Sequence, residues 1–93
     1  KYFELVDFAI DVCEQLGLTM ALLPTWGDKV TPAWGAGPAV FTPENAGPYG
    51  AFLARRYATK PILWILGGDR PIQNDREKLI WRNMAQGIRS VVG

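Results

Sequence analysis

Two short and almost entirely apolar runs constrain the fold of this chain more than any other feature. Leu18–Leu23 has the sequence LTMALL and Ile62–Leu66 has the sequence ILWIL, and each is bounded by glycine or proline. Neither run alternates between apolar and polar residues, which is typical of strands covered on both faces of a parallel sheet. The first run could instead be a buried helical turn, but its length and the flanking Gly17 and Pro24 favour a strand.

Helical patterns surround the two strands. We predict helices over residues 2–16, 49–58 and 75–91. In the first helix, acidic residues recur every three or four positions and predict a solvent-facing stripe, and Gly17 follows where a left-handed C-cap belongs. Asn74 and Glu77 have the spacing of a capping box at the start of the last helix. Strands that alternate with helices in this way predict an α/β fold with a parallel sheet and right-handed crossovers.

Residues 24–48 form a long predicted loop after the first strand. The loop holds five of the seven prolines and three large aromatic residues. Loops of this length are usually functional or disordered, and the aromatic residues argue against disorder. Thr42 and Pro43 predict a short helical turn within the loop, which Pro48 would separate from the main helix.

Two parallel strands do not form a stable sheet by themselves. Leaving one face of both strands in water would expose on the order of 200–300 Å² of apolar surface, at about 25 cal/mol per Å². That cost is comparable with the net stability of a whole domain. We therefore expect residues 1–93 to be one partial domain that oligomerises through its sheet or belongs to a longer protein. Two βα units are a quarter of an eight-stranded barrel, so a fragment of a (β/α)8 TIM barrel is favoured.

Composition and charge exclude several classes of function. Ten Lys and Arg residues against nine Asp and Glu residues give a formal charge of +1, too small to attract nucleic acid or an anionic membrane. The absence of histidine excludes His-based zinc sites and catalytic triads, and the single Cys13 excludes an intramolecular disulfide. The sequence shows neither a membrane span nor a signal peptide. We predict no metal, no cofactor, and neither nucleic acid nor membrane as a partner.

Candidate functional residues follow both predicted strands. In parallel α/β folds, ligands bind at the carboxyl ends of the strands. Asp69 and Arg70 follow the second strand after two glycines, and Asp28 follows the first strand. Asp69 is either a catalytic or substrate-binding carboxylate or an aspartate that caps a turn. Asp28 can contact substrate, pair with Arg70 or stabilise a local turn.

The four tryptophans divide between binding and packing. Trp26 and Trp34 lie in the long loop, where they can stack on sugar rings or form a small core beneath the loop. Trp64 lies within the second strand and Trp81 on the apolar side of the last helix, so both are predicted to be core residues. The glycine pair after the second strand suggests a phosphate loop, but the Lys-Ser/Thr pair that such a loop needs is absent.

Four stretches of the sequence together carry a family resemblance. They are YFELVDFAID at 2–11, GLTMALLPTWGDKV at 17–30, PILWILGGDR at 61–70 and WRNMAQGIR at 81–89. The chain resembles, over essentially its whole length, the third and fourth βα units of the apiosidase-like glycoside hydrolases, a bacterial family of (β/α)8 barrels. The resemblance implies a segment of a secreted or periplasmic enzyme that hydrolyses pectic, apiose-containing polysaccharide of the plant cell wall.

The same resemblance implies roles for individual residues. Asp69 would be the general acid/base, and Trp26, Asp28 and Arg70 would line the sugar site. The second catalytic carboxylate would come from a later strand of the barrel, so the isolated chain would be inactive. Two alternatives remain: a non-catalytic unit that oligomerises through its sheet edges and binds carbohydrate through Trp26 and Trp34, and a phosphate-binding domain. Copies of the chain could also close a barrel and bring Asp28 near Asp69, since adjacent strands lie about 4.8 Å apart.

Overall fold

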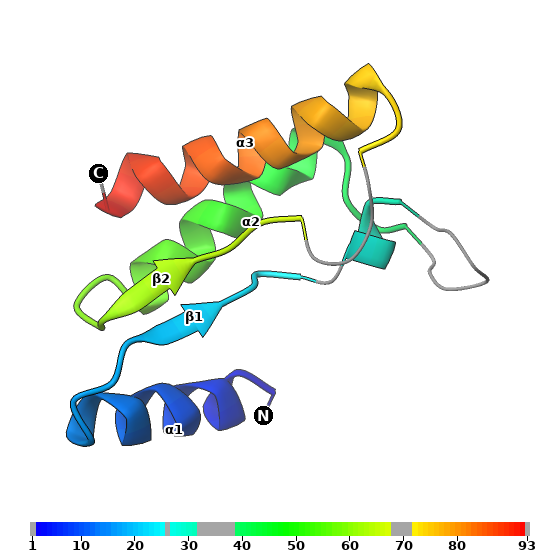
Figure 1. Ribbon diagram of the computed structural model, residues 1–93. Coiled ribbons are helices and arrows are strands. Elements are labelled where there is room, and N and C mark those ends of the chain that lie inside the picture. The colour runs from blue at the N-terminus through cyan, green and yellow to red at the C-terminus, as the bar shows by residue number, and fades with distance from the viewer. Residues whose placement is uncertain (1, 26, 32–38, 68–71, 93) are drawn as a thin grey trace.

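The computed structural model describes residues 2–25, 27–31, 39–67 and 72–92 (Figure 1). For Asp28 it describes the backbone alone. The elements in chain order are α1 (Tyr2–Gln15), β1 (Met20–Leu22), the 3-10 helix η1 (Gly27–Lys29), α2 (Pro43–Arg56), β2 (Ile62–Trp64) and α3 (Asp75–Val92). None of the helices in these described ranges is long and apolar enough to cross a membrane.

The two strands pair in parallel, as the sequence predicts. Leu22 lies opposite Trp64 in the register, so both strands end at the same edge of the sheet. The strands are shorter than the predicted ranges 18–23 and 62–66. Leu18 is held outside β1, because its backbone N–H donates to the carbonyl of Cys13 at the end of α1 (2.8 Å).

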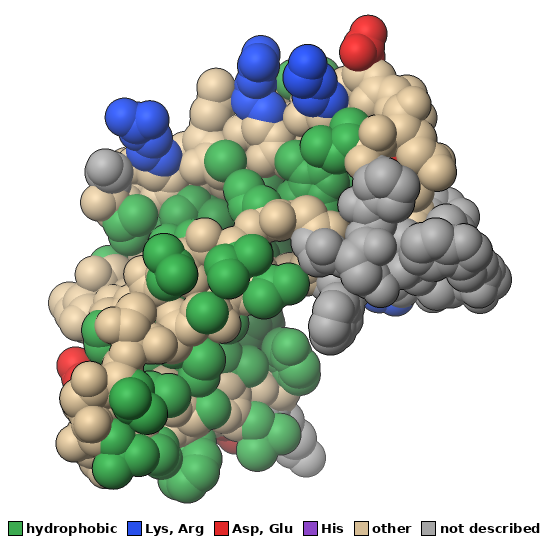
Figure 2. Space-filling model, in the orientation of Figure 1, with side chains coloured by type: hydrophobic (Ala, Val, Ile, Leu, Met, Phe, Trp, Pro, Cys, Tyr) green, Lys and Arg blue, Asp and Glu red, His purple; other side chains and the backbone are tan. Residues whose placement is uncertain are grey.

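One face of the sheet is covered and the other is open. Side chains from both strands, such as those of Leu22 and Trp64, pack against the α1–α2 cluster of Ile10, Leu53 and Tyr57. On the other face Ala21 is exposed and 58% of Leu63 is accessible to solvent. Figure 2 shows hydrophobic side chains gathered over the strands and α1. The chain by itself therefore leaves one apolar face of the sheet open, as expected of a partial domain.

The second helix begins earlier than predicted, at Pro43 rather than at residue 49. Thr42 caps it in a capping box with Asn45: Thr42 Oγ1 accepts from the Asn45 N–H at 3.1 Å, and Asn45 Oδ1 accepts from the Thr42 N–H at 2.8 Å. Pro48 lies inside the helix instead of dividing it. Gly47 has no Cβ to clash with the Pro48 ring, which removes part of the usual penalty for helical backbone before proline.

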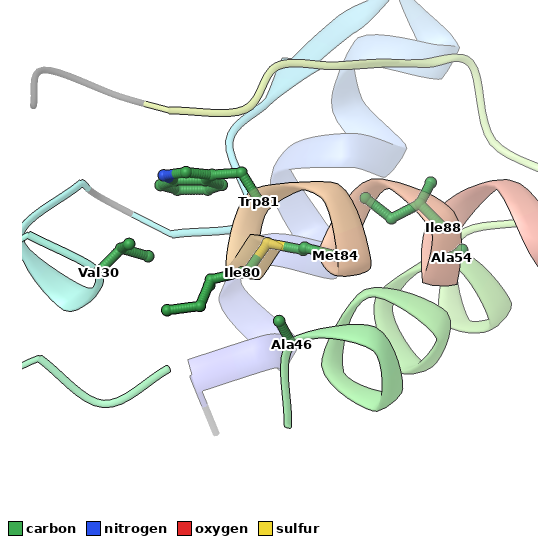
Figure 3. Packing of buried hydrophobic residues seen from close by; sticks show 7 residues of the cluster. All are labelled: Val30, Ala46, Ala54, Ile80, Trp81, Met84 and Ile88. Atoms are coloured by element: carbon green, nitrogen blue, oxygen red, sulfur yellow. The ribbon is translucent and has the colours of Figure 1, made fainter. Parts of the chain in front are cut away.

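The main core lies between α2 and α3. It contains Val30, Ala46, Ala54, Ile80, Trp81, Met84 and Ile88 (Figure 3). The predicted core position of Trp81 is confirmed, whereas Trp64 is only partly buried, at the side of this cluster. The helices approach closely because Gly50 of α2 and Gly87 of α3 each face the backbone of the other helix. A Cβ on Gly87 would lie 2.1 Å from the carbonyl oxygen of Gly47.

The first helix ends as predicted, and its acidic stripe is exposed at Glu4 and Glu14 but also forms ion pairs with the chain around the end of α2. Gly17 has φ +73°, and the N–H groups of Gly17 and Leu18 bond back to the carbonyls of Glu14 and Cys13. Asp7 is half-buried and pairs with Arg56 of α2 (2.6 Å). The sequence did not predict these ion pairs, nor that the apolar Leu5 and Phe8 are about 70% exposed.

This α1–α2 contact predicts a specific loss of stability in acid. Hydrogen bonds from Arg56 and then Tyr57 lower the pKa of Asp7 to about 2, against about 3.9 in an unfolded chain. A lowered pKa stabilises the fold above the unfolded-state value, and that stabilisation disappears as the pH falls from about 4 to about 2. In urea unfolding between pH 2 and 6, Asp7→Asn should flatten the pH dependence in this window. Glu4→Gln, an exposed position on the same helix, should keep the wild-type profile; identical profiles for all three proteins would contradict the assignment.

Candidate functional site

The candidate site lies at the edge of the sheet where both strands end (Figure 1). Tyr49 of α2 holds the chain as it leaves β1, since its hydroxyl donates to the carbonyl of Pro24 at 2.5 Å. Burial raises the pKa of this tyrosine. After β2 the chain turns at Gly67, whose φ of +103° suits glycine and few other residues. Asp69 is two residues further along the sequence.

Four of the five predicted site residues lie outside the described residues: Trp26, Trp34, Asp69 and Arg70. The fifth, Asp28, contributes its backbone to η1, and its side chain is not described. Stacking by the tryptophans, a contact between Asp28 and Asp69, and pairing of Asp28 with Arg70 therefore stay predictions. The structure does describe the parts of the chain next to these positions.

The segment after β1 is folded back on itself at η1. The N–H groups of Val30 and Thr31 donate to the carbonyl of Gly27 at 3.0 and 2.8 Å. The carbonyl of Lys29 accepts from the N–H groups of Val40 and Phe41, at 2.8 and 3.1 Å, so the outgoing and returning parts of the loop are joined. Val30 is buried in the main core, which attaches this junction to α2 and α3.

A buried carboxyl group connects this junction to the start of α3. Glu77 is 6% exposed, and its Oε1 accepts from the Thr31 hydroxyl at 2.7 Å and from the Gln73 N–H at 2.9 Å. Only half of the predicted capping box forms: Asn74 Oδ1 accepts from the Glu77 N–H at 2.8 Å, while the Glu77 side chain binds Gln73 and Thr31. The sequence carries no local signal for the Thr31 contact, because the two residues are 46 positions apart.

At the opposite edge of the sheet, where the two strands begin, ion pairs connect the chain to α1. Lys60, just before β2, donates to Asp11 at 3.0 Å and to Glu14 at 2.8 Å, and these carboxylates raise its pKa. Together with the Asp7–Arg56 pair, these ion pairs join α1 to the chain around the end of α2. In parallel α/β barrels this edge serves stability and the carboxyl-end edge serves chemistry. Within the described ranges, no group of three or more acidic or cysteine side chains is arranged to hold a metal ion.

A parallel strand pair backed by helices, with its loops at the carboxyl-end edge, defines this chain as an α/β unit of the kind that builds (β/α)8 barrels. The model of the apiosidase-like catalytic domain matches residues 1–92, and the chain belongs to this family. No curated protein matches it.

A solved structure gives the same answer for the fold. The crystal structure of a glycoside hydrolase family 5 protein from Bacteroides vulgatus ATCC 8482 is similar, with a TM-score of 0.81 and 31% sequence identity. The match covers 97% of this chain and 18% of that chain, so this chain spans less than a fifth of its relative's length. The predicted family and the predicted fold, a segment of a barrel, are both confirmed.

Proposed function

We propose that this chain supplies one catalytic carboxylate and part of the sugar-binding surface to a glycoside hydrolase barrel. The observation that carries the proposal is the parallel register of β1 and β2, which directs both following segments from one edge of the sheet. The family match over residues 1–92 supports hydrolysis of a glycosidic bond as the chemistry.

The proposed chemistry needs two carboxyl groups on either side of the scissile bond. Asp69 donates a proton to the leaving glycosidic oxygen as the carbon–oxygen bond breaks. The second carboxyl group comes from a later strand of the same barrel. It either bonds to the anomeric carbon, in which case Asp69 then accepts a proton from the water that hydrolyses this bond, or it accepts a proton from the water that attacks that carbon directly. Arg70 binds substrate oxygens beside Asp69, and Asp28 holds a sugar hydroxyl. The substrate class we propose is pectic polysaccharide with apiose in its side chains, and the enzyme is secreted or periplasmic.

The same proposal predicts what covers the open face of the sheet. Ala21 and Leu63 are exposed there, and parallel sheets are normally covered on both faces. We propose that core residues of the same barrel cover this face. Neighbouring strands of the barrel pair with the free outer sides of β1 and β2. Association of several copies of the chain is the alternative partner for the same surface.

The test is hydrolysis by the full-length protein that contains this chain. Apiose-containing pectic oligosaccharides are compared with pectin fragments that lack the side chain, and released sugar is measured. Hydrolysis of the first set alone supports the proposed substrate. Hydrolysis of other glycans supports the reaction but not the substrate, and binding without hydrolysis favours a non-catalytic carbohydrate-binding unit.

The proposed stacking of sugars on the loop tryptophans gives a second prediction. Trp26→Ala and Trp34→Ala should each raise KM for the oligosaccharide about three- to tenfold, with a smaller effect on kcat, because stacking contributes to ground-state binding. Steady-state kinetics on the full-length enzyme measures both constants. Val40→Ala, an exposed apolar position in the same loop, is the matched control and should leave KM unchanged. If the tryptophan variants instead lose thermal stability and keep KM, the indoles are packing residues.

A further inference from the structure

One buried oxygen joins the two segments that carry the proposed site. Glu77 Oε1 accepts hydrogen bonds from Thr31 Oγ1 at 2.7 Å and from the Gln73 N–H at 2.9 Å. Thr31 belongs to the segment after β1, which includes Trp26, Asp28 and Trp34. Gln73 belongs to the segment after β2, which includes Asp69 and Arg70.

Glu77 itself is held rigidly. Its N–H donates to Asn74 Oδ1 at 2.8 Å, which fixes the first turn of α3. Ile80 and Trp81, one turn further along the helix, are buried in the main core. On the other side of the contact, Val30 anchors Thr31 to the same core. The carboxyl group is therefore a fixed point against which both segments are placed, and its 6% exposure keeps water from competing for the two hydrogen bonds.

We propose that Glu77 is a positioning residue for the glycosidase site. It sets the placement of the Asp69 segment relative to the segment with the loop tryptophans, and it does so without touching substrate. This inference rests on the proposed function. Catalytic groups have to be held close to the reacting bond, and a displacement of about 1 Å can lower the rate about 100-fold. A connection between the acid-bearing segment and the sugar-binding segment is therefore expected to control kcat.

The test compares Glu77→Leu with Glu77→Gln in the full-length protein. Leu fills the space and removes the acceptor, whereas Gln keeps a carbonyl oxygen that can accept both bonds. We expect Glu77→Leu to lower kcat by up to about 100-fold, with a smaller change in KM, and Glu77→Gln to stay within about tenfold of wild type. Thr31→Val and Thr31→Ser form a second pair, in which only Thr31→Ser keeps the hydroxyl donor and the activity.

Hydrogen exchange supplies a readout that does not depend on activity. The amides of Val30, Thr31, Val40 and Phe41 report on the segment after β1. Their exchange should be about tenfold faster in Glu77→Leu and Thr31→Val, because each substitution removes a hydrogen bond that holds this segment. It should be close to wild type in Glu77→Gln and Thr31→Ser. Ile88→Val, a core change at the far end of α3, controls for general loss of stability.

The outcomes separate this inference from the proposed function. Faster loop exchange together with a kcat loss that exceeds the loss in Ile88→Val supports the positioning role. Faster exchange with kcat equal to that of Ile88→Val, or unchanged exchange in Glu77→Leu, overturns it. If the wild-type protein hydrolyses no glycan, the proposed function fails and the catalytic part of the inference falls with it. In that case faster exchange in Glu77→Leu but not in Glu77→Gln still supports the contact between the two segments.

Discussion

Replacing Asp69 with asparagine should lower kcat/KM of the full-length hydrolase about 10²–10⁴-fold, the usual contribution of a general acid or base. Asparagine has nearly the same size as aspartate. It cannot give a proton to the leaving oxygen or take one from water. The loss should therefore appear in kcat with little change in fold, and circular dichroism and the unfolding midpoint should match wild type.

A change of leaving group tests the role of Asp69 more sharply than the rate loss alone. An aryl glycoside with a good leaving group needs little protonation, so Asp69→Asn should retain much more of its activity on that substrate than on the natural polysaccharide. Asp75→Asn is the matched control, because it makes the same chemical change at an exposed position six residues away. Equal losses on both substrates would indicate that Asp69 is the nucleophile, and activity within twofold of wild type would remove Asp69 from the mechanism.

The parts of the fold that the sequence predicted correctly have local causes. The end of α1 follows from Gly17, whose left-handed conformation and return hydrogen bonds involve only the preceding turn. The start of α3 follows from Asn74 in the same way. Parallel pairing of β1 and β2 follows from two apolar runs separated by a helix. Parallel strands need a crossover connection of a dozen or more residues, and the chain between the two runs is long enough to provide one.

The parts that the sequence did not predict depend on contacts between distant residues. Pro48 by itself indicates a helix break. The helix nevertheless continues through Pro48, because Thr42 caps its start and α2 packs on α3. The acidic residues of α1 have the spacing of a solvent-facing stripe, and only the position of Arg56 and Lys60 in space shows that members of this stripe form ion pairs with the chain around the end of α2. Periodicity shows that a helix has two faces but does not show what lies opposite each face.

For the candidate site the limit is of the same kind. The sequence placed candidate residues at the carboxyl ends of both strands, and the register confirms that these ends share one edge. It gave no indication that Glu77 contacts Thr31, because a carboxylate three residues after Asn74 is fully explained by helix capping. A residue with a local explanation can also have a long-range role, and only the fold reveals the second.

The largest expected loss of stability comes from adding a single methyl group where α2 and α3 meet. In Gly87→Ala the new Cβ would lie 2.1 Å from the carbonyl oxygen of Gly47, and in Gly50→Ala it would lie 2.4 Å from that of Met84. Real Cβ atoms essentially never approach closer than 3.0 Å, and a backbone carbonyl cannot rotate away as a flexible side chain can. The two helices would have to separate, which loosens the core around Met84 and Ile88.

Two opposing effects decide the sign of the Gly87→Ala change. Alanine favours a helix interior over glycine by about 1 kcal/mol, which alone would stabilise α3. Overpacking against backbone costs about 3 kcal/mol or more in a core that cannot relax, so the substitution should destabilise the protein and lower its urea midpoint. Gln86→Ala, the exposed neighbouring position, should leave the midpoint nearly unchanged. A midpoint for Gly87→Ala at or above the wild-type value would mean that helix propensity wins and that α2 and α3 are less tightly packed than their glycines imply.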